Sequence, residues 1–71
     1  MKHLTFSLTD EYIELIKLLK ALGIAENGAH AKQMVENGNV KVNNTIEFRK
    51  RCKIKPGYSV TLNDIKIEII R

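Results

Sequence analysis

Five cations fall within seven residues near the middle of the chain, in the run Arg49-Lys50-Arg51-Cys52-Lys53-Ile54-Lys55. A run of this density can neutralise several phosphates of a polyanion by ion pairing and counterion release. Its two arginines can also stack on unpaired bases or fork onto phosphate oxygens, which lysine does less well. Many charge runs are only solvated surface, so the run alone does not decide between these interpretations, and the neighbouring segments favour contact with RNA.

A second group of candidate residues lies at the start of a predicted helix. Asn27, Gly28 and Ala29 leave backbone N–H groups open there, and the positive end of a helix dipole attracts anions. Lys32 follows in the next turn with a full charge. His30 is a weaker candidate because imidazole is mostly neutral at pH 7. The alternative is an ordinary capped helix in which the glycine only opens the chain.

Positive charge is concentrated in one part of the chain. The net charge is +4, but residues 41–55 carry +5 and the remainder carries −1. Lys41 opens this stretch, and Glu47 is its single carboxylate. The distribution, more than the total, predicts one face suited to a polyanion.

No catalytic or metal-binding pattern is recognisable. His3, His30, Cys52 and the eight carboxylates fall into no metal-ligand spacing, nucleophile–base motif or phosphate-binding loop. We therefore expect neither an enzyme nor a cofactor, a metal or a small-molecule substrate. The single cysteine forms no internal disulfide, and the cations around Cys52 are expected to lower the pKa of its thiol and make it reactive.

Two aromatic residues lie close to the basic run. Phe48 directly precedes Arg49 and could stack on a base, but a single aromatic residue that ends a strand more often belongs to the core. The same expectation applies to Tyr58.

Periodicity predicts a strand and two helices in the first half of the chain. Alternating apolar residues indicate a half-buried strand over residues 4–8. A helix is expected from an N-cap at Thr9 to Leu22, with Gly23 as its C′ residue. A second helix is expected from an N-cap at Asn27 to Asn37, ended by Gly38.

The second half of the chain reads as short strands and tight turns. Residues 40–42 and 45–48 are expected to pair as a hairpin, because Asn43-Asn44 can supply the positive φ values of a tight turn. Pro56-Gly57 marks another turn. Two further strands and the turn between them are expected at 60–62, 65–69 and Asn63-Asp64. The order β-α-α-β-β-β-β predicts an α+β fold, with two helices packed on a small, mainly antiparallel sheet.

Length and composition limit the class of protein. At 71 residues, with 44% hydrophobic and 28% charged residues, the chain is expected to form one globular domain over residues 1–71 with a small core. The N-terminus lacks the apolar segment of a signal peptide, and no run approaches the roughly 20 apolar residues of a membrane span. We expect a cytoplasmic monomer without membrane contact.

The spacing of several small and apolar residues resembles that of the RNA-binding domain named after ribosomal protein S4. The family pattern runs roughly Gly-Leu-x-x-Ser-Arg-x-x-Ala-Arg-x-x-Ile-x-x-Gly-x-Val-x-Val-Asn-Gly and later reaches a Pro-Gly-Asp turn. The likeness covers about residues 12–62. Residues that match at the same spacing are Gly23, Ile24, Ala31, Lys32, Val35, Gly38, Val40, Val42, Asn43 and Pro56-Gly57.

The chain departs from this pattern mainly in its charges. Asn27-Gly28 replaces the Ser-Arg pair, Lys32 replaces the second arginine, and Glu14-Leu15-Ile16 replaces an Arg-Leu-Asp opening of the first helix. Lys50-Arg51 stands where many relatives carry Pro-Ser, so charge has moved from the helices to the segment after the hairpin. The run Arg-Lys-Arg-Cys-Lys is similar to that of small, stand-alone bacterial members.

The resemblance implies the αL RNA-binding fold, in which the second helix and the following loop meet structured RNA. Ribosomal RNA, tRNA or a ribosomal particle is the expected partner, bound by phosphate geometry and shape more than by base sequence. The residues predicted to contact RNA are Asn27, Gly28, His30, Lys32, Lys41, Asn43, Arg49, Lys50, Arg51, Lys53 and Lys55.

Two other functions stay open at this stage. A protein-interaction module would use the same basic face on an acidic partner, or would offer an exposed sheet edge to an added strand. A DNA-binding protein is the third alternative, although no recognition-helix pattern for the major groove stands out. RNA binding would be separated from these two alternatives by a strong salt dependence of binding and by a preference for RNA over DNA.

Overall fold

A five-stranded sheet with the strand order β1-β7-β6-β3-β4 forms one layer of the molecule. The computed structural model describes all residues from 1 to 71. β1 runs parallel to β7, and the other neighbouring pairs are antiparallel. The strands are β1 (Lys2–Ser7), β3 (Val40–Val42), β4 (Thr45–Ile46), β6 (Ser59–Leu62) and β7 (Ile65–Ile70).

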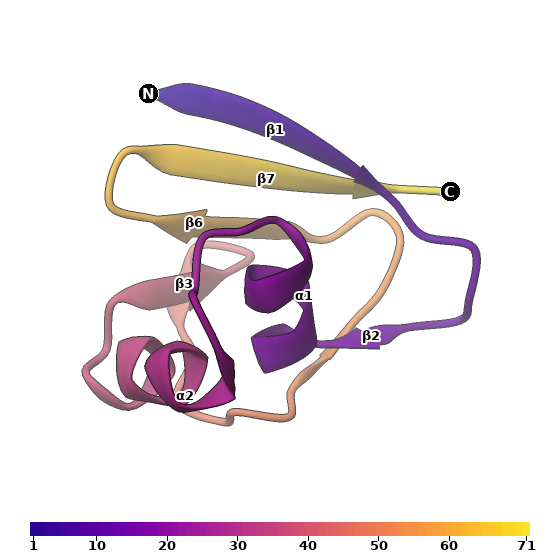
Figure 1. The fold of residues 1–71 in the computed structure, drawn as a ribbon. Coiled ribbons are helices and arrows are strands. Elements are labelled where there is room, and N and C mark those ends of the chain that lie inside the picture. The colour runs from indigo at the N-terminus through magenta and orange to yellow at the C-terminus, as the bar shows by residue number, and fades with distance from the viewer.

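Two short helices, α1 (Leu15–Ala21) and α2 (Gly28–Glu36), lie on the same side of this sheet (Figure 1). The predicted α+β class, with two helices on a mainly antiparallel sheet, is confirmed. Alternate strand residues point to the helices, as Val40 and Val42 do on either side of exposed Lys41. Neither α1 nor α2 has the length and apolar character that a membrane-spanning helix requires. The largest fully buried side chains are Leu15, Leu18, Leu19, Val35, Val40, Ile54, Val60, Leu62, Ile67 and Ile69.

A second, two-stranded sheet joins the start of α1 to the basic run. β2 (Ile13–Glu14) pairs antiparallel with β5 (Lys53–Ile54), and Ile13 lies opposite Ile54. In Figure 1 the basic segment, drawn in orange, passes below the helices and rises beside β2 toward β6. This pair of strands was absent from the sequence prediction, because two residues are too few to show a period.

The predicted start of the first helix at Thr9 is wrong. The helix begins at Leu15, because residues 13–14 are extended and pair with β5. The first helical N–H groups find partners in the basic run: Leu15 N donates to the Cys52 carbonyl at 2.9 Å and Ile16 N to the Lys50 carbonyl at 3.2 Å. A tertiary contact therefore replaces the expected side-chain cap.

The second helix and the hairpin follow the sequence prediction closely. Asn27 is the N-cap of α2, and its side chain accepts a hydrogen bond from His30 N at 2.8 Å. Gly38 has a φ of +74°, which ends the helix in the left-handed region. Asn43 and Asn44 have φ values of 51° and 71°, as a tight hairpin turn needs.

The return strand of the hairpin is shorter than predicted. β4 covers Thr45–Ile46 rather than residues 45–48, and one further hydrogen bond joins Glu47 N to the Val40 carbonyl at 3.0 Å. After this bond the chain leaves the sheet and becomes the basic run, which crosses to β5.

Candidate nucleic-acid interface

A hollow of about 660 Å³ lies between the hairpin turn, the basic run and the turn before β6, and we call it the basic concavity. Five of the predicted contact residues line it, and four of these five carry a positive charge. Its lining residues are Val42, Asn43, Glu47, Arg49, Arg51, Cys52, Lys53, Lys55 and Tyr58.

The exposed cations of the basic concavity alternate with buried residues along the chain. Cys52 and Ile54 are buried, whereas Arg51, Lys53 and Lys55 are exposed. β5 is extended, so burial of Cys52 and Ile54 directs Lys53 and Lys55 to the exposed side. Arg51 lies in the turn that the Cys52 N–H closes on the Arg49 carbonyl at 3.2 Å, and its side chain lines the same hollow. The hydrogen bonds from the start of α1 hold the backbone of this run in place.

Arg49 is tied to Glu47 by three hydrogen bonds. Glu47 Oε2 accepts from the Arg49 backbone N–H and from Nε, both at 3.0 Å, and Oε1 accepts from Nη2 at 3.1 Å. This contact holds the pKa of the Glu47 carboxyl at about 2, well below its ordinary value of 4.5. The carboxylate therefore remains ionised at neutral pH.

The remaining cations of the concavity have no carboxylate partner. The structure contains three ion pairs, Lys17–Glu14, Arg49–Glu47 and Lys50–Glu36. Arg51 and Lys55 belong to none of them, and the Lys53 ammonium lies 4.9 Å from the centre of the Tyr12 ring. These three side chains can neutralise phosphates without first breaking an ion pair.

Asn43 lines the concavity but its side-chain oxygen is already used. Its Oδ1 accepts a hydrogen bond from Ser59 N at 2.9 Å, and its own N–H donates to the Ser59 carbonyl at 2.8 Å. Asn43 therefore fixes the hairpin turn to the start of β6, and its amide NH₂ remains available to donate to a ligand.

The other predicted contact residues lie outside the basic concavity. The Lys50 ammonium donates to Glu36 Oε2 at 3.1 Å, which ties the basic run to the end of α2. Lys41 lies on the sheet face away from the helices. The residues that remain are in the first two turns of α2 or cap it: Asn27, Gly28, His30 and Lys32.

At the start of α2 part of the hydrogen-bonding capacity is already used. His30 Nδ1 accepts from Glu26 N at 3.1 Å, while the His30 N–H donates to the Asn27 side chain. The arrangement differs from a capping box, because the histidine side chain accepts from the residue before the N-cap rather than from the N-cap itself. A Cβ at Gly28 would meet nothing within 4 Å, so the space in front of this glycine is open.

The predicted reactivity of Cys52 is wrong. Its side chain is buried, and this burial, together with the neighbouring Glu47 carboxylate, raises the pKa of the thiol. The Arg49 guanidinium acts in the other direction but is outweighed. Because the thiolate is the reactive form, Cys52 behaves as a core residue.

The expectation that Phe48 belongs to the core is also wrong, because 61% of this residue is exposed. Side chains of residues 46–49 point alternately to two sides of the chain. Glu47 and Arg49 share one side, and Ile46 and Phe48 share the other, at the sheet edge. Atoms of the Phe48 ring lie 3.4 and 3.6 Å from the place that a Cβ on Gly38 would occupy. Tyr58, in contrast, is half-buried and packs against the core, as expected.

The predicted contact residues did not include Glu47 and Tyr58, which line the basic concavity, or Tyr12, whose ring lies against the Lys53 ammonium. Glu47 had a detectable signal, because a carboxylate two residues before an arginine lies on the same side of an extended segment. Tyr12 had none, since it reaches Lys53 only through the pairing of β2 with β5.

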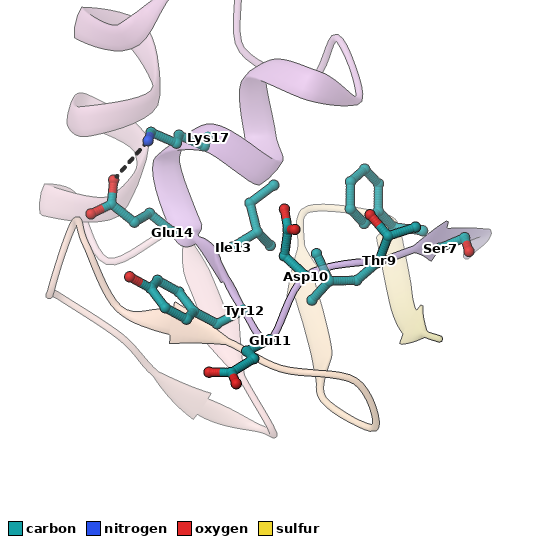
Figure 2. A pocket seen from close by; sticks show the side chains of 10 residues that line it. Ser7, Thr9, Asp10, Glu11, Tyr12, Ile13, Glu14 and Lys17 are labelled. Atoms are coloured by element: carbon teal, nitrogen blue, oxygen red, sulfur yellow. Dashed lines mark ion pairs between the residues drawn. The ribbon is translucent and has the colours of Figure 1, made fainter.

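A second hollow, of about 650 Å³, lies between the end of β1 and the start of α1, and we call it the acidic groove (Figure 2). Three carboxylates line it, against one lysine, and Lys17 Nζ lies 3.6 Å from Glu14 Oε1. Figure 2 shows the Asp10 and Glu11 carboxylates pointing in different directions. Nowhere in the molecule do three His, Cys, Asp or Glu side chains gather as a metal site would require. The groove is lined by Phe6, Ser7, Leu8, Thr9, Asp10, Glu11, Tyr12, Ile13, Glu14 and Lys17.

Comparison with known proteins places these features in a family. Residues 6–70 match the S4 domain. The chain is 42% identical over 67 residues to "Putative RNA-binding protein YbcJ" of Escherichia coli K12 and to "Uncharacterized protein YbcJ" of Shigella flexneri, covering 93% of this chain and 96% of each relative. The solution structure of Escherichia coli YbcJ, described as revealing an αL motif involved in RNA binding, matches with a TM-score of 0.73 and 41% identity, over 94% of this chain and 86% of that one.

Proposed function

The chain belongs to the S4 domain family, and we propose that it is a non-catalytic protein that binds structured RNA through the basic concavity. The observation that carries this proposal is the alignment of Arg51, Lys53 and Lys55 on one exposed face, none of them paired with a carboxylate. The description of Escherichia coli YbcJ as an RNA-binding αL protein supports it.

Binding in this proposal is driven mainly by phosphates. Each phosphate neutralised by a lysine or an arginine releases counterions, which favours association at low salt. The deep, narrow major groove of helical RNA hides the base edges, so a rigid row of cations recognises the path of the backbone more than its sequence. Lys32, Lys41 and the open N–H groups around Gly28 serve as secondary contacts outside the concavity.

Ribosomal RNA, tRNA or a ribosomal particle is the proposed target, bound by a single copy of the chain in the cytoplasm. These are the abundant structured RNAs of that compartment, and all present dense phosphate arrays. Duplex DNA is a poorer fit, since no recognition-helix pattern for the major groove stands out in the sequence.

The experiment that tests the proposal is a binding titration with tRNA and with a hairpin fragment of ribosomal RNA over a salt series. The test variant is Arg51→Glu/Lys55→Glu, which reverses two exposed charges that take part in no ion pair. We expect its affinity for both RNAs to fall roughly 100-fold near 150 mM salt, and its salt dependence to become shallower, because phosphate contacts are lost.

A matched control is Lys2→Glu/Lys20→Glu, which makes the same change in net charge at exposed residues in β1 and at the end of α1 that does not contact the basic run. We expect its affinity to fall by less than about fivefold, since charges beyond a Debye length are screened. Equal losses in the two variants would show that only net charge matters. The absence of RNA binding by the folded wild-type protein at low salt would contradict the proposal and favour an acidic protein partner.

A further inference from the structure

We propose that Glu47 is a positioning residue for RNA binding, which holds Arg49 in one orientation at the basic concavity. The inference rests on the proposed function, because it assigns a role within the same site. It opposes what charge alone predicts, since a carboxylate in a hollow that attracts phosphates weakens that attraction. The geometry of the Glu47–Arg49 contact indicates that the carboxylate instead fixes the arginine side chain in a binding orientation.

The contact between the two side chains has the form of a fork. Nε and Nη2 of Arg49 donate to Glu47 Oε2 and Oε1 at 3.0 and 3.1 Å, and the Arg49 backbone N–H donates to Oε2 at 3.0 Å. Parallel hydrogen bonds of this kind fix the direction of the guanidinium plane, which a single charge contact does not do. Of the Glu47 side chain only 17% is exposed, against 78% of the Arg49 side chain.

The fork leaves a defined part of the guanidinium for a ligand. Nη2 also lies 3.8 Å from Cys52 Sγ, so both Nε and Nη2 face the protein. The two N–H groups of Nη1 and the flat faces of the group remain available. A phosphate oxygen or an unpaired base that approaches the concavity therefore meets one fixed donor and one fixed plane.

Fixing this side chain in advance favours binding. A free arginine on an exposed segment samples many rotamers and loses that freedom when it binds. Glu47 has already removed the freedom in the unbound protein, so less is lost on association. The carboxylate can do this over the whole physiological range, because the Arg49 guanidinium keeps the Glu47 pKa at about 2.

The chain contains a natural comparison for this contact. Lys50 and Glu36 form an ion pair through one hydrogen bond of 3.1 Å, with 42% and 53% of their side chains exposed. Lysine makes a point contact and does not fix a plane. Replacing either glutamate by glutamine adds one unit of positive net charge, but only Glu47→Gln loosens a residue that lines the concavity.

The test compares the tRNA affinity of the wild type, Glu47→Gln and Glu36→Gln across a salt series. If Glu47 positions Arg49, Glu47→Gln binds roughly three- to tenfold more weakly despite its extra charge, and Glu47→Ala more weakly still. The slope of log affinity against log salt falls by up to about one, because the Arg49 contact is lost. Glu36→Gln binds as tightly as the wild type or more tightly.

The salt slope, a double variant and an NMR resonance distinguish loss of Arg49 positioning from partial unfolding. A variant that is only partly unfolded loses affinity by one factor at all salt concentrations and keeps its slope, which would overturn the positioning role. In an Arg49→Gln background, Glu47→Gln should no longer weaken binding, because the residue that it positions is gone, and the loss of an unpaired carboxylate should leave the affinity equal or tighter. The Arg49 Nε–H resonance should be sharp and shifted in the wild type and averaged in Glu47→Gln.

Tighter binding by Glu47→Gln, equal to that of Glu36→Gln, would overturn the inference and leave Glu47 as an unfavourable charge. Such a result would not affect the proposed function, which depends on Arg51 and Lys55. If the Arg51→Glu/Lys55→Glu variant bound tRNA as the wild type does, the proposed function itself would fail, whatever Glu47 does.

Discussion

The two hollows of this small domain have nearly the same volume and opposite charge. The basic concavity, at about 660 Å³, is lined by four cations and one carboxylate, and the acidic groove, at about 650 Å³, by three carboxylates and one lysine. Size therefore does not distinguish a site for a polyanion from a hollow of another kind. The sign of the charge and the order of the side chains do.

The hollows also differ in how firmly their charged groups are held. At the basic concavity the charged run is tied to α1 by two backbone hydrogen bonds, and Arg49 is held by a fork. At the acidic groove the carboxylates diverge, and the one ion pair is 3.6 Å long. An interface that reads the geometry of phosphates requires the first kind of order.

A shared wall connects the two regions. Tyr12 lines the acidic groove, Lys53 lines the basic concavity, and the ammonium lies over the ring at 4.9 Å. Behind them Ile13 pairs with Ile54. Changes in this wall should affect both hollows, and changes beyond it should affect only one.

The largest expected effect is a loss of stability when the β2–β5 pair between the two hollows is disrupted. Ile54 is fully buried, so Ile54→Ala should lower the free energy of unfolding by about 3 kcal/mol and loosen both hollows. Ile70→Ala, at a residue that is 45% exposed, should cost well under about 1 kcal/mol. Urea denaturation of the two variants checks the difference, and equal costs would contradict the role of the β2–β5 pair.

Low pH should have a smaller effect on stability, through the Glu47–Arg49 contact at the basic concavity. The folded-state pKa of Glu47 lies below its ordinary value, so its contribution to stability is present above about pH 4.5 and is lost as the pH falls toward 2. Screening by solvent reduces this contribution to about 1 kcal/mol. The stability difference between the wild type and Glu47→Gln should therefore disappear near pH 2 in urea titrations, and a constant difference would refute the assignment.

The contact between Tyr12 and Lys53 should contribute still less to stability. Tyr12 and Lys53 are both exposed, so their cation–π contact should stabilise the fold by about 0.5 kcal/mol. A double-mutant cycle with Tyr12→Leu and Lys53→Gln measures this coupling, and Tyr12→Phe serves as the control that keeps the ring. A coupling of zero would mean that the two hollows are independent.

The smallest expected effect is on RNA affinity when charges of the acidic groove are reversed. Asp10→Lys/Glu11→Lys reverses two charges of the acidic groove, and we expect the affinity for tRNA to change by less than about threefold near 150 mM salt, because the added charges are screened. A gain as large as the loss in Arg51→Glu/Lys55→Glu would show that the two hollows are interchangeable.

The sequence predicted most of the fold because local chemistry decides most of it. The cap at Asn27, the left-handed Gly38 and the Asn43-Asn44 turn each depend on residues a few positions apart. The start of α1 could not be predicted in this way. Leu15 rather than Thr9 begins the helix because Cys52 and Lys50, far along the chain, supply its first acceptors.

The candidate site was predicted in composition but not in arrangement. The cations of the basic run were visible in the sequence, and the spacing of Glu47 and Arg49 was a local signal for their pairing, but nothing local showed that Lys50 would pair with Glu36. For the same reason Cys52 was expected to be reactive, since its neighbours in sequence are cations while its environment in the fold is the core. Sequence gives the charges, and the tertiary contacts select which of them stay free.

The most direct test of the basic concavity as the RNA interface is an amide NMR titration of the wild-type protein with tRNA. We predict that the shifted resonances cluster at Asn43, at residues 49–55 and at Tyr58, with smaller shifts at the start of α2 and none at residues 6–11 of the acidic groove. Shifts concentrated in the acidic groove, or absent from residues 49–55 at saturating tRNA, would contradict it.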